Sequence, residues 1–415
     1  MTRQVFVTGL GMITPLGLDT AGSWNNLVNG VSGVDLISAF DPEGFETRFA
    51  AEVKGFSPED FIDKKKARHM DRFAQFAMVA MQEAMWQAEV SMEQLDPTRF
   101  AVIIGTGIGG IGTLSEQWDV LQSRGPTRVS PFLIPMMLPD MASGQISMAL
   151  GAKGPNFCTT SSCSSGAEAI GTAWNMIRHG EVDIALAGGA EAPIFPIAVA
   201  GFNSCQALSK RNDNPKGASR PFDSQRDGFV MGEGSAVLVL ESEESVRKRD
   251  GHILAELVGY GATSDAFHIT QPAPDSEGAI RAIRLALGAA GLEPNDVDYI
   301  NAHGTSTPLN DKFETLAIKT VFGPDAFAIP ISSTKSMTGH LLGAGAALEA
   351  AITVVAMQKG IIPPTINHQN KDPECDLDYT PNEARSTELH VVMSNSLGFG
   401  GHNSSLIFRA VNDVG

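Results

Sequence analysis

The stretch FAVIIGTGIGG, Phe100–Gly110, is a short apolar run that opens into a loop of glycine and threonine. A second stretch, YINAHGTSTP at Tyr299–Pro308, repeats this design later in the chain. An apolar run that ends in glycine is typical of a buried strand followed by a tight turn. The two stretches therefore predict an internal duplication, with a boundary near residue 250 after the charged segment Glu241–Asp250. We expect one half over residues 1–250 and the other over residues 251–415.

Strand-like and helix-like segments alternate on both sides of this boundary. Short β-branched or aromatic runs predict strands at Val5–Thr8, Ala101–Ile104, Val182–Ala187, Val237–Leu240, Ile253–Val258, Tyr299–Ala302, Ile329–Ser333 and Val391–Ser394. Longer amphipathic or apolar segments predict helices at Phe73–Trp86, Ala167–Arg178, Gly278–Ala290, Asp311–Phe322 and Ala346–Lys359. Such an alternation predicts a layered α/β fold.

The composition is that of an ordered, enzyme-sized chain, because 43% of its 415 residues are hydrophobic. The net charge of −17 argues against nucleic acid and against a membrane surface, since both attract clustered Lys and Arg. Glycines and Pro15 interrupt the apolar start, so neither a signal peptide nor an anchor is expected. No segment reaches the ~18 uninterrupted apolar residues that a membrane helix needs. We therefore expect a cytoplasmic protein.

Several kinds of site fit the motifs poorly. The segment Gly105–Gly110 matches the Gly-x-Gly-x-x-Gly dinucleotide pattern, but no persuasive ribose-binding acid follows, so a tight turn approached by another segment is preferred. The absence of His-Glu-x-x-His and of Cys-x-x-Cys argues against a metal site, and the absence of Gly-x-Ser-x-Gly argues against a serine hydrolase. The cysteines make a poor disulfide framework in so long a chain: Cys158, Cys163, Cys205 and Cys375.

Cys163 stands directly before the predicted helix Ala167–Arg178, among serines and threonines. Free backbone N–H groups and the positive end of the helix dipole favour the thiolate, which is the form that attacks carbonyl groups. A buried or incidental thiol is the alternative. His303 and His340 lie in glycine-rich loops after predicted strands, where α/β folds place reactive groups. The three residues together predict a nucleophile with two histidines beside it.

Glu349 lies in the helix Ala346–Lys359, which is apolar nearly all the way round. An ionised carboxylate inside such a helix needs a cation or hydrogen-bond donors, because its burial alone costs several kcal/mol. Lys335, just upstream, is the obvious partner. The alternative is that Glu349 is exposed at one edge of the helix.

Near the C-terminus, Phe399 is flanked by Gly398 and Gly400 in a loop after a predicted strand. Glycines allow backbone N–H groups to approach a substrate, and the large ring is placed to act as a gate. A tight turn between two final strands is the alternative.

These residues together resemble the β-ketoacyl-acyl carrier protein synthases, and within them the synthase II type that elongates fatty acids. The resemblance covers essentially the whole chain and rests on four motifs: Ser162-Cys163-Ser-Ser-Gly, Asn301-Ala-His303-Gly-Thr305-Ser-Thr307-Pro, Lys335-Ser-Met-Thr-Gly-His340-Leu-Leu-Gly-Ala-Gly-Ala and Gly398-Phe399-Gly400-Gly401. It implies a thiolase-like α/β fold of two duplicated halves in α-β-α-β-α layers, usually a homodimer.

The resemblance also implies a reaction. Cys163 would accept an acyl chain from its carrier protein, and malonyl-carrier protein would lose carbon dioxide and attack that chain, giving a 3-oxoacyl product two carbons longer. The implied roles are decarboxylation and enolate stabilisation for His303 and His340, ordering of these histidines for Lys335 and Glu349, and an oxyanion hole from the N–H groups of Cys163 and Phe399. No cofactor is expected, because the phosphopantetheine arm arrives on the carrier protein.

Substrate contacts follow from the same resemblance. Ile108 and Phe202 would line the acyl pocket, Thr305 and Thr307 would contact the phosphopantetheine arm, and Gly398 and Gly400 would frame the oxyanion loop. The acidic carrier protein would dock on the basic run that contains Lys64, Lys65 and Arg68. A solvated helix face is the alternative for that run.

Some positions depart from the family pattern, and they leave the preferred chain length open: Ser162, Ser164, Leu397 and His402. A stand-alone ketosynthase of a polyketide or specialised lipid pathway shares every motif and is the main alternative. An inactive partner subunit is disfavoured because the nucleophile, both histidines and Lys335 are present. The two histidines also argue against synthase III enzymes, which pair cysteine with histidine and asparagine, and against thiolases, which use a second cysteine.

Overall fold

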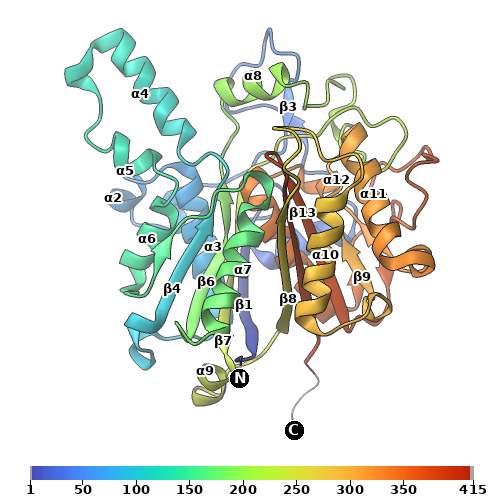
Figure 1. Cartoon of the computed structure of the whole chain (residues 1–415). Coiled ribbons are helices and arrows are strands. Elements are labelled where there is room, and N and C mark those ends of the chain that lie inside the picture. Colours follow the sequence, from blue (N-terminus) through green and yellow to red (C-terminus); the bar gives the residue numbers. More distant parts are fainter. Residues whose placement is uncertain (1, 412–415) are drawn as a thin grey trace.

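A computed structural model describes residues 2–411 and contains a large central sheet with helices packed around it (Figure 1). The sheet has ten strands: β1 (Val5–Ile13), β4 (Phe100–Gly105), β5 (Asn156–Phe157), β6 (Ile184–Glu191), β7 (Gly234–Ser242), β8 (Ala255–Ser264), β9 (Tyr299–Asn301), β10 (Ile331–Ser332), β13 (Val391–Gly398) and β14 (His402–Arg409). Two small sheets pair β2 (Asp35–Leu36) with β3 (Phe49–Ala50) and β11 (Ile361–Ile362) with β12 (Arg385–Ser386).

The two halves of the large sheet have the same strand order and the same strand directions. One half runs β5-β4-β6-β7-β1 and the other runs β10-β9-β13-β14-β8. In each half the first three strands are parallel, and the last two pair antiparallel. The halves join through β1 and β8, where only Phe6 pairs with Glu256 and Val7 with Ala255. This order confirms the predicted duplication.

Helices form three layers around these strands. They are α1 (Thr20–Val28), α2 (Lys64–Ala67), α3 (Arg72–Gln87), α4 (Ile111–Arg124), α5 (Leu133–Met137), α6 (Met141–Leu150), α7 (Ser165–Arg178), α8 (Pro196–Ser204), α9 (Glu243–Lys248), α10 (Glu277–Ala290), α11 (Pro308–Phe322), α12 (Lys335–Thr338) and α13 (Gly345–Lys359). Helix α3 packs on the first half, α10 packs on the second, and α7 and α13 contact strands of both halves. The layer order is therefore α-β-α-β-α, as predicted.

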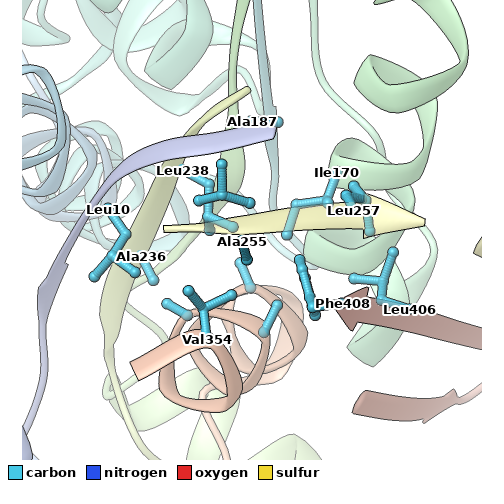
Figure 2. Close-up of a cluster of buried hydrophobic side chains, with 14 of the residues drawn as sticks. Leu10, Ile170, Ala187, Ala236, Leu238, Ala255, Leu257, Val354, Leu406 and Phe408 are labelled. Atoms are coloured by element: carbon cyan, nitrogen blue, oxygen red, sulfur yellow. The ribbon is translucent and has the colours of Figure 1, made fainter. Parts of the chain in front are cut away.

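The middle layer holds the largest apolar cluster, which Figure 2 shows around α13. Ile170 of α7 and Val354 of α13 meet Leu238 of the first half and Phe408 of the second. Every residue of α13 from Gly345 to Met357 is buried. A helix that is apolar on all sides needs cover all round, and here strands from both halves of the sheet contact it. Each large side chain gains about 1.5–3 kcal/mol from this burial. The sequence of α13 thus dictates its central place.

A Gly-x-Gly pair in each half lets an outer helix lie directly on the sheet. A Cβ atom at Gly11 of β1 would lie 2.2 Å from the carbonyl oxygen of Ala80 in α3. A Cβ atom at Gly261 of β8 would lie 2.1 Å from the carbonyl oxygen of Ala282 in α10. Only glycine allows so close an approach, so the duplication is visible in single residues as well as in strand order.

The predicted elements differ from the structure mainly at strands. Strand β1 continues to Ile13, well beyond the predicted Thr8, because its glycines lie against α3 and do not end the strand. Strand β14 was not predicted, and neither were helices α4 to α6. The expected boundary near residue 250 falls between α9 and β8 and stays a prediction, because the sheet continues across it.

All four cysteines are free thiols in the structure. Within residues 2–411, no helix is both long enough and apolar enough to cross a membrane.

Candidate active site

Loops from both halves meet around a cavity of about 460 Å³. Cys163, His303 and His340 all line this cavity, although they come from three distant segments. Most of the other predicted site residues line it too: Ile108, Phe202, Thr305, Thr307, Gly398 and Phe399. Gly400 is not part of the lining, and its N–H group donates to the carbonyl oxygen of Ile269 at 2.8 Å.

Cys163 lies in one turn of 3-10 helix, Ser162–Ser164, that leads directly into α7. The preceding Ser162 has a φ of 53°, a left-handed backbone that costs energy in any residue except glycine. Ser165 holds this turn, because its hydroxyl donates to the Ser162 carbonyl at 2.6 Å and accepts the Ser161 N–H at 3.0 Å. The turn places the thiol at the helix start, as predicted.

The Cys163 sulfur lies 3.0 Å from Nε2 of His340, and the N–H group of Phe399 donates to it. Burial raises the pKa of the Cys163 thiol to about 11, although Lys335 and the Phe399 N–H act in the opposite direction. Burial therefore favours the thiol, whereas the helix start was expected to favour the thiolate. Ionisation needs a base, and His340 is in contact.

The two histidine rings stand nearly perpendicular, with centroids 5.3 Å apart. Burial, helped by the Lys335 charge, lowers the pKa of both His303 and His340 well below the usual 6.5. Both rings are therefore neutral near pH 7. The Cys163 sulfur and one nitrogen of each ring lie within 4.8 Å of one another. A metal ion could also be held by such a group, but neutral imidazoles beside a thiol equally suit proton transfer.

Lys335 and Glu349 form a buried ion pair behind the histidines, with 1% and 2% of their surfaces exposed. The Lys335 ammonium lies 3.3 Å from Nδ1 of His303, so it fixes the proton of that ring on Nε2. Burial raises the pKa of Glu349 to about 7, and Lys335 opposes this shift. The alternative of an exposed Glu349 is wrong, because α13 is enclosed on all sides.

Phe399 begins the tight turn that joins β13 to β14, so this segment is both a hairpin turn and part of the cavity wall. A Cβ atom at Gly398 would lie 2.9 Å from the Ser161 carbonyl oxygen and 3.1 Å from the Cys163 nitrogen. Glycine is required there for the turn to reach the nucleophile.

A row of aromatic rings connects this turn to the histidines. The ring centroid of Phe202 lies 6.5 Å from that of Phe399 and 5.4 Å from that of Phe229. The Phe229 ring in turn meets the edge of His340 at 5.3 Å. Sequence reasoning did not single out Phe229, because an aromatic residue in a loop has no motif of its own.

Two further buried carboxylates were missed from the sequence. Glu314 of α11 accepts the backbone N–H groups of His303 and Gly304, each at 2.7 Å, and burial raises its pKa to about 7. Glu191, at the end of β6, accepts the N–H groups of Gly107 and Ile108 at 2.7 and 3.2 Å. For Glu191 the available signal was the one used for Glu349, a carboxylate in an apolar segment, whereas the helix of Glu314 carries other charged residues and gives no such signal.

The hydrogen bonds of Glu191 also argue against a dinucleotide site in the loop Gly105–Gly110. The N–H groups that would hold a phosphate in the loop Gly105–Gly110 already donate to a carboxylate. A second anion there would be repelled. The glycine pattern therefore forms a tight turn approached by another segment, as preferred above.

The basic run lies on the surface, on and just after α2, where Lys64, Lys65 and Arg68 are exposed. Lys64 pairs with Glu59 at 2.8 Å, whereas Lys65 and Arg68 form no ion pair within residues 2–411. The ring of His69 stacks on Phe132 at 3.9 Å, which joins this run to the segment before α5.

Comparison with known proteins agrees with this geometry. The family model described as the N-terminal domain of beta-ketoacyl synthase matches residues 2–245, and its C-terminal counterpart matches residues 254–369. The chain belongs to the β-ketoacyl synthase family. Among its synthase relatives, the 3-oxoacyl-[acyl-carrier-protein] synthase 2 of Synechocystis sp. is 51% identical over 407 residues, which cover 98% of both chains.

Solved β-ketoacyl synthase structures have the same fold. A beta-ketoacyl synthase from Burkholderia phymatum superposes with a TM-score of 0.92 at 39% identity, covering 99% of this chain and all of the other. A polyketide ketosynthase, solved with its acyl-carrier protein and a hexaketide, gives a TM-score of 0.91 at 36% identity with the same coverage.

Proposed function

We propose that this chain is the elongating condensing enzyme of fatty acid synthesis, a 3-oxoacyl-acyl carrier protein synthase of type II. It transfers an acyl chain from acyl carrier protein to Cys163 and joins it to malonyl-acyl carrier protein with loss of carbon dioxide. The observation that carries this function is the 3.0 Å contact between the Cys163 sulfur and His340, with His303 beside it in the same cavity.

In the first step, the Cys163 sulfur attacks the thioester carbonyl of the incoming acyl chain and passes its proton to Nε2 of His340. The N–H groups of Cys163 and Phe399 hold the oxyanion that forms. The carbon–sulfur bond of the carrier thioester then breaks, and the leaving thiolate takes the proton from His340. The acyl chain is left on Cys163, with its tail in the pocket lined by Ile108 and Phe202.

In the second step, the bond between the malonyl carboxylate and its neighbouring carbon breaks, carbon dioxide leaves, and the electron pair becomes an enolate. His303 donates from Nε2 to the enolate oxygen, because Lys335 keeps its proton there, and His340 donates from Nε2 after taking up a proton from solvent at that nitrogen. The enolate carbon attacks the acyl carbonyl. The bond to Cys163 then breaks, the Cys163 thiolate takes the proton that His340 holds on Nε2, and the longer 3-oxoacyl chain leaves on its carrier protein.

The comparisons support a pathway for the proposed reaction, and the site chemistry supports a reaction without a cofactor or metal. The match to the fatty acid enzyme, at 51% identity, exceeds the 36% match to the polyketide ketosynthase, which favours fatty acid elongation. The proposed reaction uses no bound cofactor or metal, because the phosphopantetheine arm arrives on the carrier protein and Thr305 and Thr307 line its path. A cytoplasmic location stays a prediction.

Purified chain supplied with acyl- and malonyl-acyl carrier proteins tests the function directly. Products longer by two carbons, and an acyl adduct on Cys163 in intact-mass measurements, are expected. Cys163→Ala should form no adduct and no product, whereas Cys163→Gln should still decarboxylate malonyl-acyl carrier protein. An adduct on Cys163→Ala would contradict the assignment of the nucleophile.

The proposal includes acyl carrier protein docking on α2. Lys65 and Arg68 are exposed and unpaired within residues 2–411, so they form a local positive site on a chain of net charge −17. The double variant Lys65→Glu/Arg68→Glu should raise the KM for acyl-acyl carrier protein about tenfold and leave kcat close to normal. Arg284→Glu/Lys359→Glu, two exposed cations outside the cavity lining, is the matched control. An equal rise in both variants would reject the docking site.

The proposal also includes a homodimer. Helices α4 and α5 project from the body of the molecule beside the β5 end of the sheet (Figure 1). They carry exposed apolar side chains, with Trp118 and Ile134 both 58% exposed. Strand β5 is the edge strand of the large sheet, paired only with β4 among residues 2–411. Such a surface suits a second copy of the chain.

Light scattering after gel filtration tests the dimer. Trp118→Glu should shift the mass from two chains to one, because it places a charge in the apolar patch. Trp86→Glu is the control, since Trp86 is 80% exposed on α3, away from α4 and α5. A monomeric wild type would contradict the homodimer.

A further inference from the structure

Glu191 is a fully buried carboxylate that the reaction described above does not use. Its two oxygens accept four hydrogen bonds: from the Thr106 hydroxyl at 2.7 Å and from the backbone N–H groups of Gly107 at 2.7 Å, Ile108 at 3.2 Å and Gly343 at 2.9 Å. Within residues 2–411, no lysine, arginine or histidine forms an ion pair with it. One hydroxyl and three backbone N–H groups, all uncharged donors, hold this carboxylate.

These donors belong to two loops that come from different halves of the molecule. Thr106 to Ile108 follow β4, whereas Gly343 lies in the turn that follows His340. A Cβ atom at Gly343 would lie 2.2 Å from the Gly107 nitrogen and 2.7 Å from Oε2 of Glu191. The loops therefore touch through glycine backbone, and the carboxylate fastens both at the point of contact.

Each loop also supplies an apolar side chain to the cavity wall. Ile108 from the first loop and Leu342 from the second both line the cavity, and they pack in one apolar cluster with Phe229. Glu191 accepts the N–H group of Ile108 itself and that of Gly343, the residue after Leu342. A shift of either loop would change the width of the apolar part of the cavity without touching Cys163.

The chemistry of the contact requires a carboxylate. Three of the four donors are backbone N–H groups, which cannot become acceptors. Glutamine has the same shape, but its NH₂ group would face donors and leave at least one buried N–H group unsatisfied. The loops would then move apart, or one of them would turn.

We infer that Glu191 is a positioning residue for the acyl chain: its carboxylate holds Ile108 and Leu342 at the separation that admits a long chain toward Cys163. This inference rests on the proposed function and adds to it the part that sets chain-length acceptance. Short acyl groups that stop before these two side chains do not depend on the separation. Long chains do.

The test compares the rates at which butyryl- and myristoyl-acyl carrier protein acylate Cys163. Intact-mass spectrometry of the protein measures the acyl adduct over time. Glu191→Gln should lower kcat/KM about tenfold or more for the myristoyl substrate and less than about threefold for the butyryl substrate. In the Cys163→Gln background, Glu191→Gln should leave malonyl decarboxylation within about twofold, because it does not touch the histidines.

Thr106→Val carries the same test if Glu191→Gln fails to fold. It removes one donor to Glu191 and should shift the chain-length profile in the same direction by a smaller factor. The control is Glu241→Gln, a second fully buried carboxylate at the opposite end of the β6–β7 pair. It should lower the melting temperature without changing the ratio of the two substrates.

Equal losses for both substrates, or the same shift in Glu241→Gln, would overturn the inference. Failure of the proposed function would look different, because the wild type would then form no acyl adduct with either substrate.

Discussion

The loops after β4 and β9 occupy equivalent places in the two halves, but they have different roles in the site. Strand β4 lies between β5 and β6, and β9 lies between β10 and β13, in sheets of the same order. Each loop has two backbone N–H groups held by a buried carboxylate, Glu191 in one half and Glu314 in the other. The first loop places Ile108 on the cavity wall, and the second places His303 there.

This comparison separates the scaffold from the chemistry. A carboxylate that accepts backbone N–H groups fixes a strand-end loop whatever side chain the loop carries. The loop after β4 then contacts a long apolar chain, and the loop after β9 takes part in proton transfer and enolate stabilisation. The duplicated fold thus provides two rigid loops, and single residues at their tips decide the role of each.

Glu349 differs from both loop carboxylates because it faces a cation, and removing that cation should give the largest effect on stability. Lys335→Met leaves a buried carboxylate without its partner, so the free energy of unfolding should fall by about 3–5 kcal/mol. Chemical denaturation measures this loss. The double variant Lys335→Met/Glu349→Gln should recover most of the stability without recovering activity. A stable single variant would show that the pair is not a structural unit.

Substitutions at the tips of the loops after β4 and β9 should affect acylation by long chains and malonyl decarboxylation separately. His303→Ala should lower malonyl decarboxylation about a hundredfold to a thousandfold, because it removes one donor to the enolate, while an acyl adduct on Cys163 still forms. Ile108→Ala should do the reverse, with normal decarboxylation and an acylation rate that falls several-fold for long chains. Carbon dioxide release and intact mass measure the two steps. If both variants lose both steps equally, the loops are not independent.

The pH dependence of stability should distinguish Glu314 from an ordinary surface carboxylate. Its pKa is about 7 in the folded chain against 4.5 in model compounds, so the folded chain binds this proton more tightly. The contribution to stability is full below pH 4.5 and falls as the pH rises through 7. From pH 5 to 8, wild type should lose about 2–3 kcal/mol relative to Glu314→Gln.

Urea unfolding at several pH values checks this difference. The variant also alters the contacts of the His303 loop, so only the change with pH is diagnostic. A difference that is constant with pH would contradict the raised pKa.

The sequence predicts much of the site because motifs there join chemistry to local structure. Cys163 before a helix, the histidines after strands and Glu349 in an apolar helix all have a local signal, and the structure brings all of them together with Lys335. The duplication was also predictable, since the loops after β4 and β9 resemble each other.

The missed parts depend on distant backbone groups. The partners of Glu191 are N–H groups from two loops, and backbone atoms leave no trace in a sequence. The burial that raises the pKa of Cys163 was missed for a related reason: the helix start is visible in the sequence, but the packing around the thiol is not. Strand β14 was missed because polar residues such as Asn403, Ser404 and Ser405 are buried in it.

The shared middle layer also has a consequence during synthesis of the chain. The strands of the first half are complete at Ser242, but α7 alone covers their inner face until α13 has been made, up to Lys359. At about 5–20 residues per second, that face waits roughly 10 s on the ribosome. The part of that apolar face which α13 later covers is therefore exposed for this interval, and exposed apolar surface on an incomplete chain favours aggregation.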